Sequence, residues 1–415
     1  WAEPNGHRDV DDHLEHQHGG DADHHQGFEI GAGPAGTFAA ERLARAGLKT
    51  TLIDEKLAWE KPCGGGVTYK AYQEYPYLLE NDTSKRLVHE TVIAAPDAGE
   101  AKMDLGRPLL IYSRLDLNKM LIERADKAGA QLEKTRVLSI ERKERNWELH
   151  TMHGTMQADY CVVAAGARNP LKNAGTEWTA QDTMSALGYF VEGKQEHIDI
   201  QFLPNLSGYI WVFPRDGHMS VGIGGKGEPA HALRASLERY MDERGIRYKG
   251  AKFYSHMLPS LASPGWKRNR ISGEGWLAAG DAAGLVDPIT GEGIYYAMKS
   301  GDLASRAVLD DSLGIKEKAA AYRSAIAREF SHDLEFASFL ARRVFLGQFF
   351  FKTVPQRMVE FTRRSARFRA LMQDLFAGTQ PYLELRKRLL DNLNGPIQET
   401  FLRMFLERVI PKTPA

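Results

Sequence analysis

The 415-residue sequence predicts an α/β protein that combines a parallel sheet, a second β-rich region and a helical C-terminal region. Three observations support this fold class. A glycine-rich turn at residues 31–36 separates a short strand from a helix, and a second glycine-rich stretch at residues 280–293 follows another apolar strand. The pattern is β-rich from about residue 182 to 262 and helical from about residue 315 onward.

Composition limits the classes of protein to consider. The chain is long enough for two or three domains, and its formal net charge of zero gives no indication of nucleic-acid binding. Its two cysteines, Cys63 and Cys161, argue against a disulfide framework and against a structural zinc site. No uninterrupted apolar run is long enough to span a bilayer, so we expect a cytoplasmic protein. Residues 1–26 are polar and His-rich, and we expect them to form a disordered tail without a specific metal site.

The first glycine-rich turn has the pattern of a dinucleotide-binding βαβ unit. GAGPAG at residues 31–36 precedes the helical segment TFAAERLARAG and the short strand KTTLIDE, which ends near Asp54. Gly31 allows the tight turn, Gly33 lets the backbone approach a pyrophosphate, and Gly36 lets the helix pack on the sheet. Asp54 lies where a carboxylate is expected to hold ribose hydroxyls, and the helix N-terminus supplies amide donors.

The strand before this turn is unusual. A central parallel strand is buried on both faces and is normally a continuous apolar run, but this one reads HHQGFEI. Only Phe28 and Ile30 are apolar, and Glu29 would lie in the interior. The sequence leaves open whether this segment is altered or is a genuine but poorly packed first strand.

The second glycine-rich stretch, AAGDAAGLVDPITGEG, predicts the other half of the same cofactor site. A buried strand leads to Asp281, whose carboxylate can accept hydrogen bonds from a chain of hydroxyls. Small residues at 282–284 and 291–293 let the next helix begin against a ligand. Two such elements about 250 residues apart fit the extended dinucleotide FAD better than NAD alone.

Several motifs together resemble a known group of flavoproteins. GAGPAG, YSRLDLNKML, VVAAGA and AAGDAAGLVDPITGEGIYYAMKSG are similar to the p-hydroxybenzoate hydroxylase-like FAD-dependent oxidoreductases. Within that group, KPCGGGV, GYIWVFP and GEGIYYAMKSG resemble the geranylgeranyl reductase family, which saturates the phytyl chain of chlorophyll and the isoprenoid chains of archaeal lipids. The resemblance runs from about Gly31 to about residue 395.

This resemblance implies a Rossmann-like FAD-binding domain, an antiparallel β-sheet substrate domain and a C-terminal helical region. We expect a tail at 1–26, a discontinuous FAD-binding domain at 27–75, 110–180 and 265–312, a substrate domain at 76–109 and 181–264, and the helical region at 313–415.

The resemblance also implies which residues hold the cofactor. Arg114 would lie near the phosphates or the ribityl chain, and Val137 would meet the adenine through its backbone. The full expected set is Gly31, Gly33, Pro34, Ala35, Gly36, Asp54, Cys63, Gly64, Gly65, Arg114, Val137, Gly166, Asp281, Pro288, Gly291, Gly293 and Ile294.

Two motifs point to the reacting centre and the substrate. By the resemblance, the loop from Cys63 to Gly66 would lie beside the isoalloxazine ring, where the thiol either positions a substrate, helps to deliver a proton or is simply a small neighbour. Tyr209, Trp211 and Phe213 alternate on one face of a strand, which suits either core packing or the wall of a substrate tunnel. Cys63, a water or Tyr209 are the candidate proton donors.

The activity that the resemblance implies is reduction of isolated carbon–carbon double bonds in a geranylgeranyl-bearing lipid or diphosphate, as a step of lipid biosynthesis. Hydride would come from reduced FAD, itself reduced by a donor such as NADPH or ferredoxin. Residues 341–415 hold 14 Lys and Arg against six Asp and Glu, together with the apolar run VFLGQFFFKTV. This segment suits either peripheral contact with an anionic membrane or packing on the flavin domain.

Two alternatives remain at this level. One is a flavin monooxygenase or halogenase on the same fold. A monooxygenase would be expected to carry a DG pair after the strand near residue 160, where this chain has AAGAR. A halogenase would be expected to carry a WxWxIP motif, where this chain has YIWVFP. The other alternative is a non-catalytic prenyl-lipid binding protein that has lost its flavin through the unusual first strand.

Overall fold

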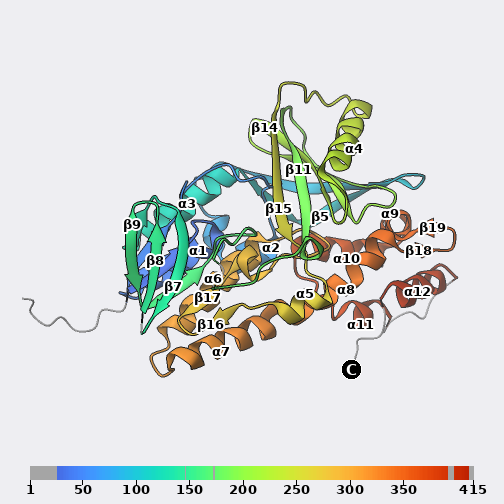
Figure 1. Ribbon diagram of the computed structural model, residues 1–415. Helices are drawn as coiled ribbons and strands as arrows, with labels where there is room; N and C mark the ends of the chain where they lie inside the picture. Colours follow the sequence, from blue (N-terminus) through green and yellow to red (C-terminus); the bar gives the residue numbers. More distant parts are fainter. Residues whose placement is uncertain (1–25, 145, 172, 391–396, 411–415) are drawn as a thin grey trace, which may run out of the picture.

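The computed structural model describes residues 26–144, 146–171, 173–390 and 397–410. Figure 1 shows an elongated molecule with a parallel sheet and a small three-stranded sheet at one end, and a large sheet with the C-terminal helices at the other. The predicted His-rich tail lies outside the described residues except for its last residue, Gln26.

The parallel sheet has the strand order β16-β17-β10-β1-β2-β6, with parallel pairing from β17 to β6 and an antiparallel edge pair β16–β17. The chain leaves β1 for β2 on one side and later returns to β10 on the other, so a topological switch point lies beside β1. The strands are β1 (Gln26–Ile30), β2 (Lys49–Ile53), β6 (Gln131–Glu133), β10 (Tyr160–Val163), β16 (Ser272–Gly273) and β17 (Trp276–Ala278).

Strand β1 forms in spite of its polar sequence and pairs with both β2 and β10. Phe28 and Glu29 are both fully buried, and the two carboxyl oxygens of Glu29 have no hydrogen-bond partner among the described residues. Burial raises the pKa of Glu29 well above its ordinary range, which favours the neutral carboxyl. The first strand is therefore present, with an unpaired acid in its interior.

The turn between β1 and helix α1 (Pro34–Arg45) is closely packed. Gly31 has a φ of 110°, and a Cβ there would lie 2.3 Å from the carbonyl oxygen of Ala164. A Cβ on Gly36 would lie 2.0 Å from the carbonyl oxygen of Gly31, whereas a Cβ on Gly33 would meet nothing within 4 Å. The backbone therefore requires glycine at 31 and 36, while Gly33 borders open space.

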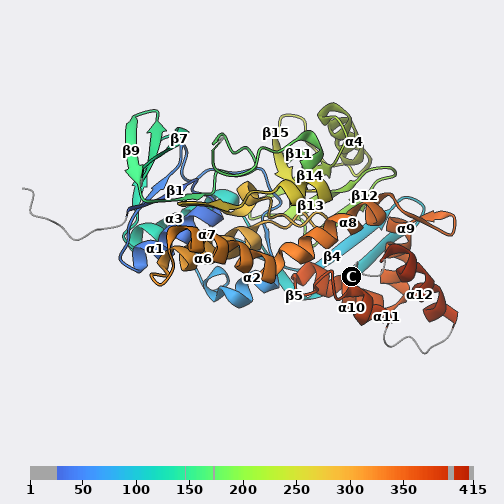
Figure 2. The same cartoon turned by 60° about the horizontal axis from the view of Figure 1, so that its bottom comes forward.

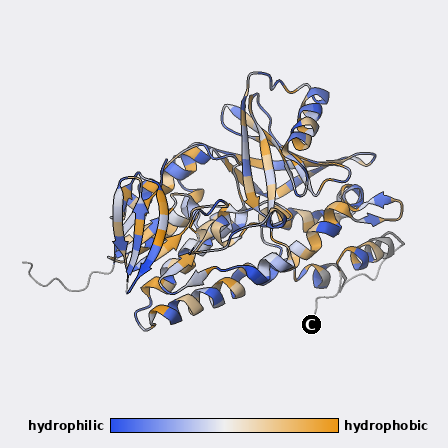
Figure 3. Cartoon of the chain, in the orientation of Figure 1, coloured by the Kyte–Doolittle hydropathy of each residue, from blue (hydrophilic) through white to orange (hydrophobic). Residues whose placement is uncertain are grey.

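Helices cover the parallel sheet and link it to the rest of the molecule. α1 packs against α3 (Arg114–Lys127) and α6 (Ile294–Leu309), and α6 packs against α7 (Ile315–Ile326). Figure 3 shows hydrophilic and hydrophobic residues alternating along α7, as expected for a helix with one face on the core. The antiparallel strands β7 (Val137–Lys143), β8 (Asn146–Thr151) and β9 (Gly154–Ala158) precede β10 and form a separate small sheet.

The large sheet has the order β15-β11-β14-β13-β12-β4-β5-β3, and all its pairs are antiparallel except β4–β12. Strand β5 continues beyond the range 76–109 expected for the substrate domain, and β3 lies within the range 27–75 expected for the FAD-binding domain. They are β3 (Gly66–Val67), β4 (Lys85–Ala95), β5 (Gly99–Tyr112), β11 (Thr183–Glu192), β12 (Ile198–Phe202), β13 (Gly208–Pro214), β14 (His218–Gly225) and β15 (Lys252–Pro259).

Helix α4 (Ala230–Glu243) packs against β11 and β14, while the C-terminal helices α9 and α10 pack on the strands β4 and β5. Figure 2 brings these C-terminal helices forward, where they lie across the large sheet. The remaining helices are α2 (Tyr69–Glu74), α5 (Ser263–Arg268), α8 (His332–Leu346), α9 (Val354–Arg364), α10 (Ala366–Ala377), α11 (Leu385–Leu390) and α12 (Ile397–Val409), with a hairpin of β18 (Gln348–Phe349) and β19 (Lys352–Thr353).

Among the described residues, the chain is thus largely helical from Ile315, as the sequence predicts, with the short hairpin and connecting loops between the helices. Within the described residues, no helix is long and apolar enough to cross a membrane.

Candidate functional site

The candidate cofactor site begins where β1, β2, β10 and β17 end side by side. The glycine turn follows β1, and Asp54 follows β2. Oδ2 of Asp54 accepts a hydrogen bond from the amide of Ala32 at 2.9 Å, and Oδ1 accepts from the amides of Lys56 and Leu57 at 2.7 and 2.8 Å. The carboxylate predicted to hold ribose hydroxyls is therefore anchored beside the glycine turn.

Asp281 lies just beyond β17 at the same edge of the sheet. Nζ of Lys61 lies 3.1 Å from its Oδ2. Burial raises the pKa of Asp281, but the charges of Lys61 and Arg114 and the hydrogen bond from Lys61 hold it below its ordinary value. An ionised carboxylate is thus available to accept hydrogen bonds from a polyol.

Nitrogen-bearing side chains gather around Asp281. Arg114 is buried at the start of α3, and its Nε has no partner among the described residues. Nε2 of His256, on β15, also has no hydrogen-bond partner among the described residues. Burial and then the charge of Lys61 lower the pKa of His256 to about 4, so its imidazole is neutral at pH 7.

The residues present fit FAD. The α1 N-terminus faces the open space at Gly33 and offers amide donors to a diphosphate, and the orphaned Nε of Arg114 is a further donor available to the cofactor. We propose that Asp54 binds the adenosine ribose and that Asp281 binds the ribityl chain at the other end of the site.

Two further predicted contacts lie on the parallel-sheet side. Val137 begins β7 and is buried in the core cluster of the parallel sheet. Gly166 follows β10 with a φ of 81°, and a Cβ there would meet nothing within 4 Å. A cavity is described in the next paragraph, and some of the residues predicted to bind the cofactor do not line it. These residues are Gly31, Gly33, Pro34, Ala35, Gly36, Asp54, Arg114, Val137, Gly166 and Asp281.

A largely apolar cavity of about 250 Å³ lies between the large sheet, the loop before α6 and the C-terminal helices. Three stretches that are far apart in the sequence meet there. The predicted site residues that line this cavity are Cys63, Gly64, Gly65, Tyr209, Trp211, Phe213, Pro288, Gly291, Gly293 and Ile294.

The aromatic wall comes from one face of β13. Tyr209, Trp211 and Phe213 line the cavity, whereas Ile210 and Val212 between them are buried in the core beneath α4. The hydroxyl of Tyr209 donates a hydrogen bond to the carbonyl of Thr290 in the loop before α6. This bond ties the wall to the segment that contains Gly291 and Gly293.

The C-terminal helices close the opposite side of the cavity. Phe345 of α8, Met358 of α9 and Met372 of α10 all contribute to the lining. The ring of Phe345 stacks near that of Tyr209 with centroids 6.4 Å apart. Flexible methionines and aromatic rings suit an apolar, flexible ligand.

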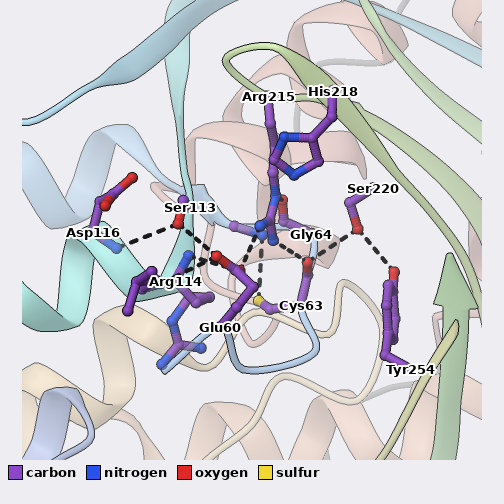
Figure 4. A network of polar contacts seen from close by, with 12 residues as sticks. Glu60, Cys63, Gly64, Ser113, Arg114, Asp116, Arg215, His218, Ser220 and Tyr254 are labelled. Atoms are coloured by element: carbon purple, nitrogen blue, oxygen red, sulfur yellow. Dashed lines mark hydrogen bonds and ion pairs between the residues drawn. The ribbon is translucent and has the colours of Figure 1, made fainter. Parts of the chain in front are cut away.

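A buried arginine holds the loop that contains Cys63 (Figure 4). Arg215 is 1% exposed and donates to Oε1 of Glu60 and to the carbonyl of Cys63, both at 2.5 Å. The hydroxyl of Ser220 donates to the same carbonyl at 3.1 Å. The backbone of Cys63 is therefore fixed from β14 and from the end of β13.

Glu60 connects this loop to the FAD side of the molecule. It accepts hydrogen bonds from the hydroxyl of Ser113 at 2.5 Å and from the amide of Arg114 at 3.0 Å (Figure 4). Burial raises the pKa of Glu60, but the charge of Arg215 and the hydrogen bonds hold it below its ordinary value. One ionised carboxylate thus caps α3 and pairs with the arginine that holds the Cys63 loop.

The glycines after Cys63 are required by the packing of the loop. Gly65 has a φ of 89°, and a Cβ there would lie 2.1 Å from the carbonyl oxygen of Tyr112. Its amide donates to Sγ of Cys63 at 3.3 Å. A Cβ on Gly64 would lie 3.2 Å from the ring of Phe213, so both the loop and the aromatic wall depend on the missing side chains.

Four residues of this site were missed from the sequence. Glu60 and Lys61 directly precede PCGGG, and Arg215 directly follows YIWVFP, so adjacency to the motifs was an available signal. His256 lies in an ordinary strand, and its role depends on pairing of β15 with β11, which no local pattern reveals.

Comparison with known proteins agrees with this geometry. The family model for pyridine nucleotide-disulphide oxidoreductases matches residues 30–197. The chain is 30% identical to the geranylgeranyl diphosphate reductase of Rhodobacter capsulatus, over 68% of this chain and 74% of that protein. It is 28% identical to the menaquinone reductase of Mycobacterium tuberculosis, over 79% and 86% of the two chains.

Among solved structures, the fold is similar to that of a geranylgeranyl bacteriochlorophyll reductase-like protein from Thermoplasma acidophilum. The TM-score is 0.73 at 22% identity, covering 88% of this chain and 99% of that one. A flavin-dependent brominase has a TM-score of 0.67 at 18% identity, covering 93% and 98%. By the match to the Rhodobacter reductase and the shared flavoprotein architecture, this chain belongs to the geranylgeranyl reductase family of FAD-binding oxidoreductases.

Proposed function

We propose that this protein is a FAD-dependent reductase that saturates carbon–carbon double bonds of a geranylgeranyl chain. The observation that carries the proposal is the apolar, aromatic-lined cavity, which is bordered at once by the Cys63 loop and by the loop before α6. The relatives named geranylgeranyl diphosphate reductase support the same substrate class.

The cofactor supplies the redox chemistry, because reduced FAD delivers a hydride equivalent from its N5 position when bound. The residues of this chain supply position and exclusion of water. Tyr209, Trp211 and Phe213 hold the apolar chain from one side, and Phe345 and Met358 hold it from the other. The glycines after Cys63 let the loop pack against Tyr112 and Phe213, which places the loop at the edge of the cavity.

Cys63 and Tyr209 take part in this positioning. Cys63 lines the cavity with its backbone fixed by Arg215, so its thiol marks one edge of the reacting region. Burial raises the pKa of Tyr209 above its ordinary value, and its hydroxyl proton is already committed to Thr290. We therefore assign Tyr209 to the wall of the cavity and to anchoring the loop before α6.

Conversion of oxidised FAD back to reduced FAD requires a two-electron donor or two one-electron steps, and we propose NADPH or ferredoxin in that role. The substrate reaches the cavity from a lipid phase or as a soluble diphosphate. A basic C-terminal region supports peripheral contact with an anionic membrane. At the tip of the β18–β19 hairpin, Phe351 is fully exposed and Phe350 is 48% exposed, and Leu346 at the end of α8 is 44% exposed.

A flavin-dependent halogenase or monooxygenase is the second candidate, because the brominase has a similar fold. The identity of 18% supports the architecture alone. The residues at the motif positions, Tyr209 and Phe213, differ from the WxWxIP pattern of halogenases, which favours the reductase. A flavin-free lipid-binding protein is disfavoured because β1 and its glycine turn are formed in full.

Anaerobic reoxidation of the flavin tests the proposal. The purified holoprotein is reduced, mixed with geranylgeranyl diphosphate without oxygen, and followed by flavin absorbance. We expect reoxidation with the unsaturated substrate and none with phytanyl diphosphate, which is saturated. Equal behaviour with the two diphosphates would contradict the proposal.

A further inference from the structure

One end of the apolar cavity is polar and contains ionisable groups. Saturation of a double bond needs a proton as well as a hydride, and this proton must enter a cavity that otherwise excludes water. The polar residues of this part of the lining include Thr68, Lys70, Asp287, Thr290, Glu292, Tyr295 and Tyr296. Glu292 and Lys70 carry the functional groups best suited to proton transfer.

Glu292 lies between Gly291 and Gly293, two glycines that line the cavity and that we expect to contact the cofactor. Its Oε1 accepts a hydrogen bond from the amide of Tyr295 at 2.7 Å, which fixes the carboxyl at the start of α6. Its backbone carbonyl accepts from the amide of Asp287 at 2.8 Å. A hydrogen bond thus fixes one carboxyl oxygen of Glu292, and the residue lines the cavity.

The carboxyl of Glu292 is tuned for proton transfer near neutral pH. Burial raises its pKa to about 7, aided by the charge of Asp287 and opposed by the Tyr295 amide and the charge of Lys70. A donor with a pKa near the working pH combines a protonated form with a useful driving force. Tyr209 and Tyr296 have pKa values raised above that of ordinary tyrosine and are poorer acids.

Lys70, whose charge acts on Glu292, lies at the inner end of a series of contacts that leads to the surface through α2 and α6. Nζ of Lys70 lies 4.6 Å from the ring centroid of Tyr295, whose hydroxyl donates to Glu74 at 2.9 Å. Lys299 pairs with Glu74 at 2.5 Å and with Glu329 at 3.8 Å. The side chains of Glu74 and Glu329 are 32% and 38% exposed, so this path ends in solvent.

The helix that carries Glu329 has an irregularity at this position. Residues Ala327–Ser331 form a π-helical segment between α7 and α8, and its Phe330 packs against Tyr296 of the cavity lining at 5.3 Å. Such segments recur at functional sites because they turn side chains out of the α-helical register. Here the segment sets Glu329 opposite Lys299.

The other acids near the cavity are held in structural contacts. Asp287 accepts from the Tyr382 hydroxyl at 2.8 Å and from the amides of Ile289 and Thr290. Asp333 accepts from the amide of Leu383 at 2.9 Å. The ionisable groups whose charges act on Glu292 or Lys70 are Glu74, Asp287, Glu329 and Asp333, with Tyr295, Tyr296, Lys299 and Tyr382 adjoining them.

We propose that Glu292 is the general acid that protonates the alkene, and that Lys70 with the surface acids Glu74 and Glu329 restores its proton from solvent. This inference rests on the proposed reductase function. The O–H bond of Glu292 breaks and a C–H bond forms at one alkene carbon, while the hydride forms the second C–H bond at the other. The two electrons come from the reduced flavin, the π bond is consumed, and Glu292 is left as a carboxylate until solvent reprotonates it.

The test uses single-turnover flavin reoxidation by geranylgeranyl diphosphate as a function of pH. Glu292→Gln retains an oxygen for the Tyr295 amide but cannot donate an acidic proton, and Lys70→Met removes the neighbouring charge. Glu228→Gln, an exposed site beyond β14, is the matched control. Bound FAD, thermal unfolding and the flavin reduction potential are measured for each protein, together with infrared difference spectra.

We expect Glu292→Gln to slow reoxidation by about 100-fold or more with FAD content and unfolding unchanged. The wild-type rate should fall above about pH 7, and Lys70→Met should move that fall to higher pH because a cation stabilises the carboxylate. The wild-type minus Glu292→Gln infrared spectrum should contain a carboxyl band that titrates in the same range.

An unchanged rate and pH profile in Glu292→Gln would overturn the inference while leaving the reductase intact. An absent carboxyl band, or a Lys70→Met profile identical to wild type, would also overturn it. Failure of wild-type protein to reoxidise with this substrate would overturn the proposed function and the inference together.

Discussion

Arg215 holds the loop that contains Cys63, although it lies outside the sequence motifs that predicted the site. Its guanidinium reaches Glu60 and the carbonyl of Cys63 from within the protein interior. Because Glu60 also caps α3 beside Arg114, a single ion pair links the cofactor side to the substrate sheet. Breaking such a buried pair leaves an uncompensated charge.

We expect Arg215→Lys to destabilise the protein by about 2 kcal/mol, because an ammonium cannot span the forked contacts of a guanidinium. FAD should also bind more weakly, since the Cys63 loop loses its anchor. Chemical unfolding and flavin titration measure the two effects. The exposed pair Arg244–Glu100 offers the control, and Arg244→Lys should change stability by no more than about 0.5 kcal/mol.

Glu29 affects the stability of the whole parallel sheet. Its folded-state pKa is raised, so between the unfolded and folded pKa values the native protein holds the extra proton and stability falls as pH rises. Glu29→Val should stabilise the protein by about 2 kcal/mol at pH 8 and flatten this pH dependence. Urea unfolding at about pH 5 and about pH 8 measures it, and lower stability of the variant at the higher pH would contradict this account of β1.

At this scale, the glycine motifs of the sequence predicted positions where the backbone has no room for a side chain. Gly31, Gly36 and Gly65 are required by contacts of 2.0–2.3 Å that any Cβ would make. Partners such as Lys61 and Arg215 escaped because they act across 220 and 155 positions of sequence, on Asp281 and Glu60 respectively. Pairings over such distances are set by sheet topology and leave no local pattern.

Among the elements, the β1–α1 turn is where mutations can distinguish an effect on cofactor binding from an effect on folding. Gly33→Ala places a methyl group in open space, at a φ of −74° that alanine accepts, so stability without FAD should change by no more than about 0.5 kcal/mol. FAD affinity should nevertheless fall at least about tenfold, because we propose that the diphosphate of FAD binds in that space. Fluorescence titration with FAD and unfolding of the flavin-free protein measure the two effects.

Gly36→Ala is the contrasting variant at this turn. Its Cβ would lie 2.0 Å from the carbonyl oxygen of Gly31, so the flavin-free protein should lose about 2 kcal/mol or more. Equal stability of the two variants would mean that the turn packs differently from the structure described here.

Element patterns in the sequence predicted the parallel sheet, the aromatic strand β13 and the helices after residue 315. The polar sequence of β1 left its formation in doubt, and pairing with β2 and β10 overcame it. The small sheet of β7 to β9 was not foreseen as a separate unit, because its alternating strands look the same as strands of a larger sheet.

At the scale of the whole molecule, the hairpin of β18 and β19 and the small sheet lie at opposite ends (Figure 1). Phe351 at the hairpin tip is fully exposed with a φ of 60°, and the C-terminal region is basic. We expect Phe351→Ser to weaken binding to vesicles that contain anionic lipid by roughly tenfold, because burial of one phenyl ring in lipid is lost. Leu138→Ser, at an exposed position of the small sheet, is the control, and equal binding of both variants would exclude the hairpin as the contact.

The cavity is formed by all the main parts of the molecule, because the large sheet, the glycine loops and the C-terminal helices each form one of its walls.

The measurement that tests the central claim most directly is the mass of the product. The anaerobically reduced protein is incubated with geranylgeranyl diphosphate, and the prenyl chain is read by mass spectrometry. The account predicts a gain of pairs of hydrogen atoms. An unchanged chain without oxygen, with a gain of an oxygen atom or a halogen once air and halide are admitted, would contradict it.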